Sequence, residues 1–146
     1  MLSESQQAAL LNAVPSFESV WRHWLEEQAE YVQRFPDEAL SPLELSREFL
    51  WQLDRHLGKR IAAGDTGETD WLFAALEPIY RTADSDLWAD LTVGFLESLI
   101  YAIEYNGGDA SLLHPIQKGP AVESAWRAAF AYIHSTEAEA LGWHEV

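Results

Sequence analysis

The chain of 146 residues fits one domain, and its 24 acidic and 9 basic side chains give a formal net charge of −15 at pH 7. A hydrophobic fraction of 48% with seven tryptophans excludes a disordered chain, because disorder joins high charge to low hydrophobicity. The negative charge argues against nucleic acid or an anionic membrane surface as partner, since both require clustered lysine and arginine. The absence of cysteine excludes disulfides and thiolate metal sites.

The first seven residues lack the charged and apolar regions of a secretory signal. The longest apolar run, 91–103, is interrupted by Glu97 and is shorter than the ~20 residues of a membrane helix. We therefore expect a cytoplasmic protein without a membrane span.

Apolar residues at helical spacing dominate the chain from its start. A short N-terminal helix within 1–15 should follow Ser3, because Ser3 and Gln6 have the spacing of a capping box. A second amphipathic helix is expected from Ser16 to Phe35. A third should begin at Ser41, where a capping hydroxyl is followed by proline and then glutamate.

The second half of the chain continues the pattern. The third helix should end at Gly64, and Thr69 can cap the next one, which Pro78 should kink or shorten. A helix from Asp84 to about residue 105 follows, then a single turn near 112–115. A last helix should start at Pro120, and the tail, 136–146, is expected to add a turn or fray.

These elements predict an all-α fold: one compact domain over 1–146, with about six helices in consecutive antiparallel pairs. No sequence repeat at a fixed period indicates a solenoid.

Candidate chemistry is sparse. No motif for a metal, a phosphate or a dinucleotide is present, so we expect no cofactor, no metal and no catalytic residue. Glu97 is the most interesting carboxylate because it lies in the most apolar segment. We interpret it as a buried structural carboxylate that caps a neighbouring loop or pairs with an arginine, such as Arg81 or Arg127; solvent exposure and acid–base catalysis are the alternatives.

The tryptophans favour core packing, because five of them lie on or near apolar stripes: Trp21, Trp24, Trp71, Trp88 and Trp126. Trp51 and Trp143 fall off the stripes. Each is either an exposed interface anchor or a cover for a helix edge.

Charge is unevenly distributed, with a net −8 in residues 64–119. If the helices alternate in direction, one end of the molecule collects the candidate partner-binding acids Asp65, Glu68, Asp70 and Asp109. The other end would hold Asp37, Glu38, Asp84 and Asp86. A surplus of one sign accelerates capture of an oppositely charged protein, and we favour the first end because its loops are longer.

Three segments carry a family resemblance: Leu72-Phe73-Ala74-Ala75-Leu76-Glu77 with Asp84, Thr92-Val93-Gly94-Phe95-Leu96-Glu97-Ser98-Leu99, and His114-Pro115-Ile116-Gln117-Lys118-Gly119-Pro120. Over about residues 30–134 the chain resembles an uncharacterised family of small all-α bacterial proteins with a Val-x-Phe-Leu-Glu helix. Some members of such families look like immunity proteins encoded beside toxins. The resemblance implies a cytosolic immunity protein that neutralises a toxin by stoichiometric binding, with a basic toxin domain as partner; the alternative is a helical adaptor or scaffold protein without enzymatic activity.

Overall fold

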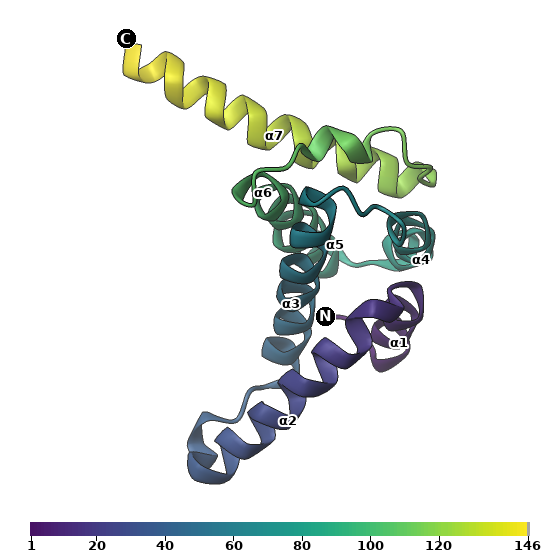
Figure 1. Cartoon of the computed structure of the whole chain (residues 1–146), viewed down its shortest axis with the longest axis vertical. Helices are drawn as coiled ribbons and strands as arrows, with labels where there is room; N and C mark the ends of the chain where they lie inside the picture. The colour runs from purple at the N-terminus through teal and green to yellow at the C-terminus, as the bar shows by residue number, and fades with distance from the viewer. Residues whose placement is uncertain (146) are drawn as a thin grey trace.

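The computed structural model describes the backbone of residues 1–145 and the side chains of residues 1–135. Within these residues the fold is all-α, as predicted. The helices are α1 (Glu4–Ala13), α2 (Glu18–Arg34), α3 (Pro42–Ala62), α4 (Thr69–Thr82), α5 (Ser85–Leu91), α6 (Ser98–Tyr105) and α7 (Pro120–Glu145) (Figure 1). The short turns η1 (Pro15–Phe17), η2 (Pro36–Glu38) and η4 (Ala110–Leu113) join them.

The π-helical segment η3 (Thr92–Glu97) links α5 and α6 into one continuous rod, so the seven α-helices of the described chain make six rods in a single compact domain. The backbone of α7 reaches Glu145, and the side chains of the predicted tail, 136–146, lie outside the described residues.

The helix starts are set by local chemistry. Ser3 and Ser41 both form complete capping boxes, each hydroxyl accepting from the backbone N–H three residues later while Gln6 or Glu44 bonds back to the cap. Asp84 caps α5 by accepting from the Leu87 N–H at 2.8 Å. These caps satisfy backbone donors that a helix start leaves unpaired, which is why the sequence predicts them.

The start of α4 differs from the sequence prediction. Thr69 is not the cap but the first residue of the helix, and its hydroxyl donates to the Thr66 carbonyl at 2.7 Å. Pro78 lies inside α4, which continues to Thr82. Because Pro78 is exposed, its ring meets solvent and displaces no core residue.

The π-helical segment reconciles the apolar pattern of the rod with its packing. Leu87, Leu91, Phe95, Leu99 and Ile103 recur at every fourth residue and all are buried. In a straight α-helix a four-residue step drifts by about 40° around the axis, so five such residues could not all face one core. The wider turns of η3 offset this drift.

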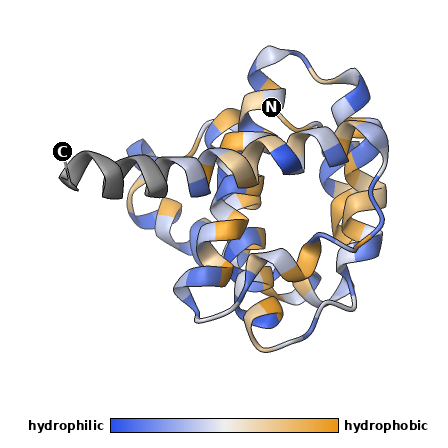
Figure 2. Ribbon diagram, turned by 90° about the horizontal axis from the view of Figure 1, so that it is seen from above, coloured by the Kyte–Doolittle hydropathy of each residue, from blue (hydrophilic) through white to orange (hydrophobic). Residues whose placement is uncertain are grey.

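The core forms around α3, which packs along α6 and η3, while α7 covers η3 and α4, and α1 packs on α4. Hydrophobic segments face the interior between the helices (Figure 2). An added Cβ at Gly58 would lie 2.5 Å from the Ala102 Cβ, and one at Gly108 would lie 2.7 Å from the Ala62 Cα. The α3 helix and the α5–α6 rod therefore run in the same direction at close range.

Candidate functional site

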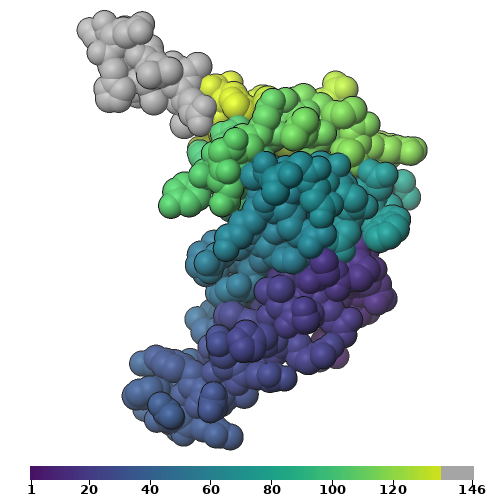
Figure 3. Space-filling model, in the orientation of Figure 1, coloured from purple at the N-terminus to yellow at the C-terminus, as the bar shows by residue number. Residues whose placement is uncertain are grey.

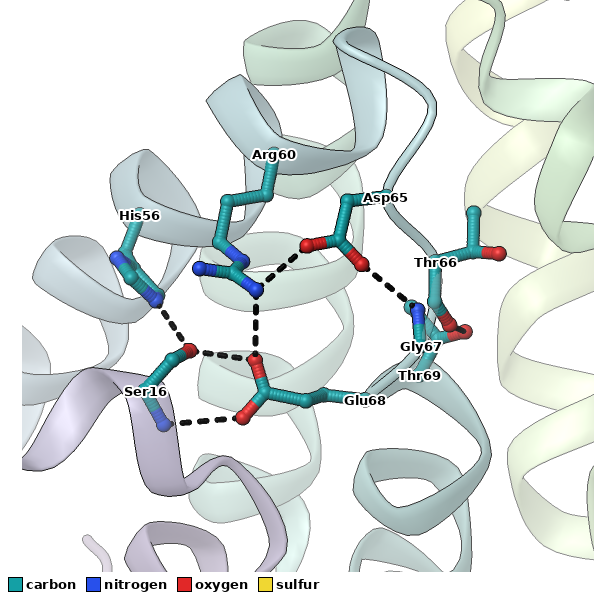
Figure 4. Close-up of polar contacts among 8 residues, drawn as sticks. All are labelled: Ser16, His56, Arg60, Asp65, Thr66, Gly67, Glu68 and Thr69. Carbon is teal, nitrogen blue, oxygen red and sulfur yellow. Dashed lines mark hydrogen bonds and ion pairs between the residues drawn. The ribbon is translucent and has the colours of Figure 1, made fainter.

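A polar cluster joins the corner between α1 and α2 to α3 and the loop before α4 (Figure 4). The Ser16 hydroxyl lies 2.7 Å from His56 Nε2 and donates to Glu68, whose second oxygen accepts from the Ser16 N–H at 3.0 Å. Arg60 contacts Asp65 at 2.5 Å and Glu68 at 3.7 Å. Serine, histidine and glutamate are the residue types of a hydrolytic triad, so their order decides what the cluster can do.

The hydrogen bonds among Ser16, His56 and Glu68 follow a different order from those of a catalytic triad. In a triad the histidine lies between serine and carboxylate and accepts the hydroxyl proton. Here the one hydroxyl proton of Ser16 goes to Glu68, which leaves His56 as donor to the same oxygen. Burial and the Arg60 charge lower the pKa of His56, against the opposing effect of Glu68. The cluster ties the N-terminal helices to the body of the protein.

The predicted acidic end is assembled as expected but is largely occupied by internal contacts. Gly108 lies against Ala62, so the loops after α3 and after α6 meet at one end of the molecule. Asp65 is bound to Arg60, and Glu68 is mostly buried, with 13% of its side chain exposed. Asp65 therefore stays exposed but ion-paired, whereas Glu68 is shielded from solvent by its contacts with Ser16 and Arg60.

The other two predicted acids differ from each other. Asp109 accepts from the Ser111 N–H at 2.9 Å and from its hydroxyl at 2.7 Å, and these hydrogen bonds lower the pKa of Asp109. Asp70 is exposed and has no hydrogen bond or ion pair with any side chain described. Among the four predicted acids, only Asp70 has both carboxylate oxygens available to a binding partner, as far as the described side chains show. Its contact with a partner stays a prediction.

Glu97 does not pair with the arginines predicted for it. Arg81 contacts Glu77 at 3.4 Å, and Arg127 contacts Glu123 at 2.8 Å. Glu97 is partly exposed at the end of η3 and has no hydrogen bond or ion pair among the described residues. Burial raises the pKa of its carboxyl. Each candidate arginine instead pairs with an acid four residues away on its own helix.

Glu77 takes the structural role that the sequence suggested for Glu97. It is 7% exposed and accepts hydrogen bonds from the Ala121 N–H at 3.1 Å and the Val122 N–H at 2.9 Å. A residue of α4 thus caps the start of α7. No local signal identifies this contact, because the partners are more than 40 residues apart.

Asp54 is the buried carboxyl that the sequence analysis missed. It is 1% exposed, both oxygens are without a hydrogen-bond partner among the described residues, and desolvation raises its pKa well above the ordinary value. Gly58 meets Ala102, 44 residues ahead, so the same offset along the parallel rod places Asp54 opposite Ser98. Its signal was available: Asp54 follows Leu50 by four residues and precedes Leu57 by three, on the apolar stripe.

The tryptophans divide differently from the prediction. Trp21 and Trp126 are buried as expected, whereas Trp71 and Trp88 are 57% and 44% exposed. Each of these two lies one position from an inward leucine, which turns it about 100° from the core. Trp51 is 50% exposed, in agreement with its place off the stripe. Its contact with a partner stays a prediction, and the Trp143 side chain lies outside the described residues.

A groove of about 420 Å³ runs between α3 and α6 beside Trp51. Its walls carry two cations, three exposed rings and two polar groups from these helices and the turn after α6: Arg55, Lys59, Trp51, Tyr101, Tyr105, Ser98 and Asn106. Neither cation has an acid within 4 Å among the described side chains. This set of groups can bind an anion and a flat apolar group side by side.

A second surface is the arm, which we define as residues 22–45: most of α2, the turn η2 and the start of α3. Figure 3 shows it extending from the body of the molecule. No residue of the arm is buried, although it presents a groove of about 430 Å³ between its two helices. That groove is lined by uncharged side chains: Leu25, Gln28, Ala29, Val32, Gln33, Ala39, Leu40 and Leu45.

The margins of the arm are acidic. It holds six carboxylates against two arginines, a net charge of −4. Tyr31 and Phe35 close its tip with ring centroids 5.0 Å apart, and they are 43% and 50% exposed. The sequence predicts α2 as an amphipathic helix, but its pattern does not show that much of the apolar stripe stays uncovered.

Among the side chains described, no three histidine, aspartate or glutamate residues lie close enough to hold a metal ion. No helix in that part of the chain is both long and apolar enough to cross a membrane. Comparison with known proteins finds no matching family model, no similar curated protein and no similar solved structure. The family resemblance therefore stays a prediction.

Proposed function

We propose that the protein is a cytosolic bacterial immunity protein that neutralises a toxin by stoichiometric binding through an acidic surface. The observation that carries the proposal is the arm, a stretch of 24 residues without one buried side chain. A helical hairpin gains most of its stability from packing an apolar face, and this one leaves much of that face uncovered. Contiguous exposed apolar surface with a polar rim is typical of protein-binding sites.

The charge of the arm selects the chemistry of its partner. Glu26, Glu27 and Glu30 are exposed on α2, and Asp37 and Glu38 follow in the turn at its end. A basic amphipathic segment fits this surface, with apolar side chains in the groove and lysine or arginine meeting the carboxylates. The formal charge of −15 adds long-range attraction, which raises the association rate more than the final affinity.

The same reasoning gives the acidic end a secondary role. Asp70 is free to contribute to the attracting field, while Asp65, Glu68 and Asp109 contribute charge but have committed hydrogen-bonding capacity. We therefore place contact at the arm and only electrostatic steering at the acidic end.

The test uses the product of a toxin gene beside the gene of this protein. Purified toxin domain and immunity protein should bind with a stoichiometry of one to one in calorimetry, and coexpression should restore growth. Leu25→Asp puts a charge into the arm groove and should weaken binding by at least about tenfold, since it buries an unpaired carboxylate. Leu112→Asp is the matched control, because Leu112 is similarly exposed, at 47% against 40%, and lies on η4.

Three outcomes contradict the proposal. Full protection by Leu25→Asp would remove the arm from the binding surface. A dimer of the wild type that Leu25→Asp converts to a monomer would show that a second copy covers the groove. Tight binding to a neighbouring gene product without neutralisation would favour the alternative, a helical adaptor.

A further inference from the structure

Arg55 and Lys59 form a common wall between two grooves, one on each side of α3. The groove toward α6 carries the three exposed rings. The groove toward α2 has a volume of about 360 Å³ and adds His56 and Arg60. A chain with 24 acids and 9 bases thus gathers four of its basic or titratable nitrogen groups on two turns of one helix.

Within the described part of the chain, Arg55 and Lys59 lack the acid partners that most basic side chains of the protein have. Six of the nine basic side chains have an acid within 4 Å: Arg22, Arg47, Arg60, Arg81, Lys118 and Arg127. Arg55 and Lys59 have none among the described side chains, and their spacing of four residues makes them repel each other. An anion between them would relieve this repulsion.

Arg55 is held in position for such an anion. Its guanidinium carbon lies 5.0 Å from the centre of the Trp51 ring, a cation–π contact that orients the side chain without using its N–H donors. A planar guanidinium with free donors binds phosphate or carboxylate through two parallel hydrogen bonds. The Ser98 hydroxyl and the Asn106 amide also line this groove. The amide already donates one N–H to the Ala102 carbonyl at 2.7 Å and keeps its second N–H for a ligand.

The rings define the other half of the ligand. Trp51 and Tyr101 are each about half exposed, and Tyr105 is 92% exposed. Stacking on such rings favours a flat group, and the groove volume of about 420 Å³ lies in the range of small-molecule sites. The cations and rings line one continuous groove, so a single molecule can reach both.

We propose that the groove between α3 and α6 binds a small anion that carries a planar ring, either a nucleoside phosphate or an aromatic carboxylate. Arg55 and Lys59 hold the anionic group, while the aromatic side chains stack on the ring. This site is separate from the arm, so it stands or falls independently of the immunity function.

The experiment follows the indole N–H resonances of the seven tryptophans in the full chain by ¹H–¹⁵N NMR. Trp51 is assigned by the loss of its signal in Trp51→Phe. The probes are AMP, 4-hydroxyphenylacetate, adenosine, inorganic phosphate and a short oligoglutamate peptide. AMP should shift the Trp51 resonance saturably, and adenosine or phosphate alone should bind at least about tenfold more weakly because each offers one half of the ligand.

Variants separate the site from general charge effects. Arg55→Gln and Lys59→Gln should each weaken AMP binding several-fold. Arg34→Gln is the matched control, because Arg34 is also exposed and without an acid partner among the described side chains, but lies on α2. All three side chains are exposed, so the substitutions should not unfold the protein. Circular dichroism checks that the variants stay folded.

The choice of probes also identifies the chemical class of the anion. Saturation by AMP assigns a phosphate, and saturation by 4-hydroxyphenylacetate alone assigns a carboxylate; either result supports a ring-bearing anion. Equal binding of inorganic phosphate and AMP would overturn the proposal, as would equal loss in Arg34→Gln and Arg55→Gln. Saturation by oligoglutamate alone, or by none of the probes, would also overturn it.

Discussion

Asp54→Asn tests the most unusual group in the core. Asp54 is 1% exposed, and its carboxyl oxygens have no hydrogen-bond partner among the described residues. Desolvation raises the pKa of this carboxyl well above its ordinary value. The folded protein therefore keeps a proton that the unfolded chain releases above a pKa of ~3.9.

The sign of the pH dependence follows from this proton. Stability from Asp54 is fully present below the unfolded pKa, falls as pH rises, and is lost once pH passes the folded pKa. Each pH unit between the two pKa values lowers the free energy of unfolding by about 1.4 kcal/mol. Asparagine has nearly the same shape and no ionisation, so the variant lacks this slope. Its unpartnered amide adds a constant cost of about 1–3 kcal/mol.

The assay is urea unfolding of wild type and variant at pH 4.5, 5.5 and 7, followed by circular dichroism. As pH rises from 4.5 the wild type should lose stability relative to the variant, by about 1.4 kcal/mol per pH unit as long as the pH stays below the folded pKa of Asp54. Asp70→Asn, at an exposed site, should follow the wild-type slope. A difference between wild type and Asp54→Asn that does not change with pH would refute the reasoning, because it would mean that Asp54 is ionised in the folded protein.

Three further predictions concern packing and capping. Glu77→Gln should lower the free energy of unfolding by about 1–3 kcal/mol in urea melts, because it weakens the cap of α7, whereas the partly exposed Glu123→Gln should cost less than 1 kcal/mol. Gly58→Ala should destabilise by about 1–3 kcal/mol, since its Cβ would lie 2.5 Å from that of Ala102, and Ala102→Gly should restore part of the loss. Glu97→Gln should leave the melting temperature at pH 7 unchanged or slightly higher, because it removes a partly desolvated charge that has no partner among the described residues. A clear fall in the melting temperature would contradict this and would mean that the Glu97 carboxylate makes a stabilising interaction.

The net charge of the protein and the charges that line the groove between α3 and α6 act at different distances. Net charge controls which partners approach the protein from a distance, whereas a bound group responds to the side chains within a few ångströms. A chain whose overall field repels nucleic acid can still hold Arg55 and Lys59 on one helix without an acid partner among the described side chains. The formal charge of −15 therefore argues against polyanionic partners but not against a small anion at α3.

The sequence alone determined the features that depend on neighbours within one helical turn. The capping boxes at Ser3 and Ser41 and the helix end at Gly64 were predictable because donors and acceptors lie three or four residues apart. The all-α class followed from the 3.6-residue period, and the exposure of Trp51 from its position off the stripe. These interactions stay the same wherever the helix is placed.

Only the tertiary structure decided the features that join distant segments. The cap that Glu77 provides for α7 crosses more than 40 residues, and Glu97 lost its expected arginines to acids on their own helices. Asp54 lies on an apolar stripe that the sequence shows. Only the packing of the α5–α6 rod against α3 leaves its carboxyl without a hydrogen-bond partner among the described residues. The sequence predicts that α2 is amphipathic, but its apolar stripe does not show whether other parts of the protein cover it. Periodicity fixes which face of a helix is apolar, while the packing of the other helices decides whether that face becomes core or surface.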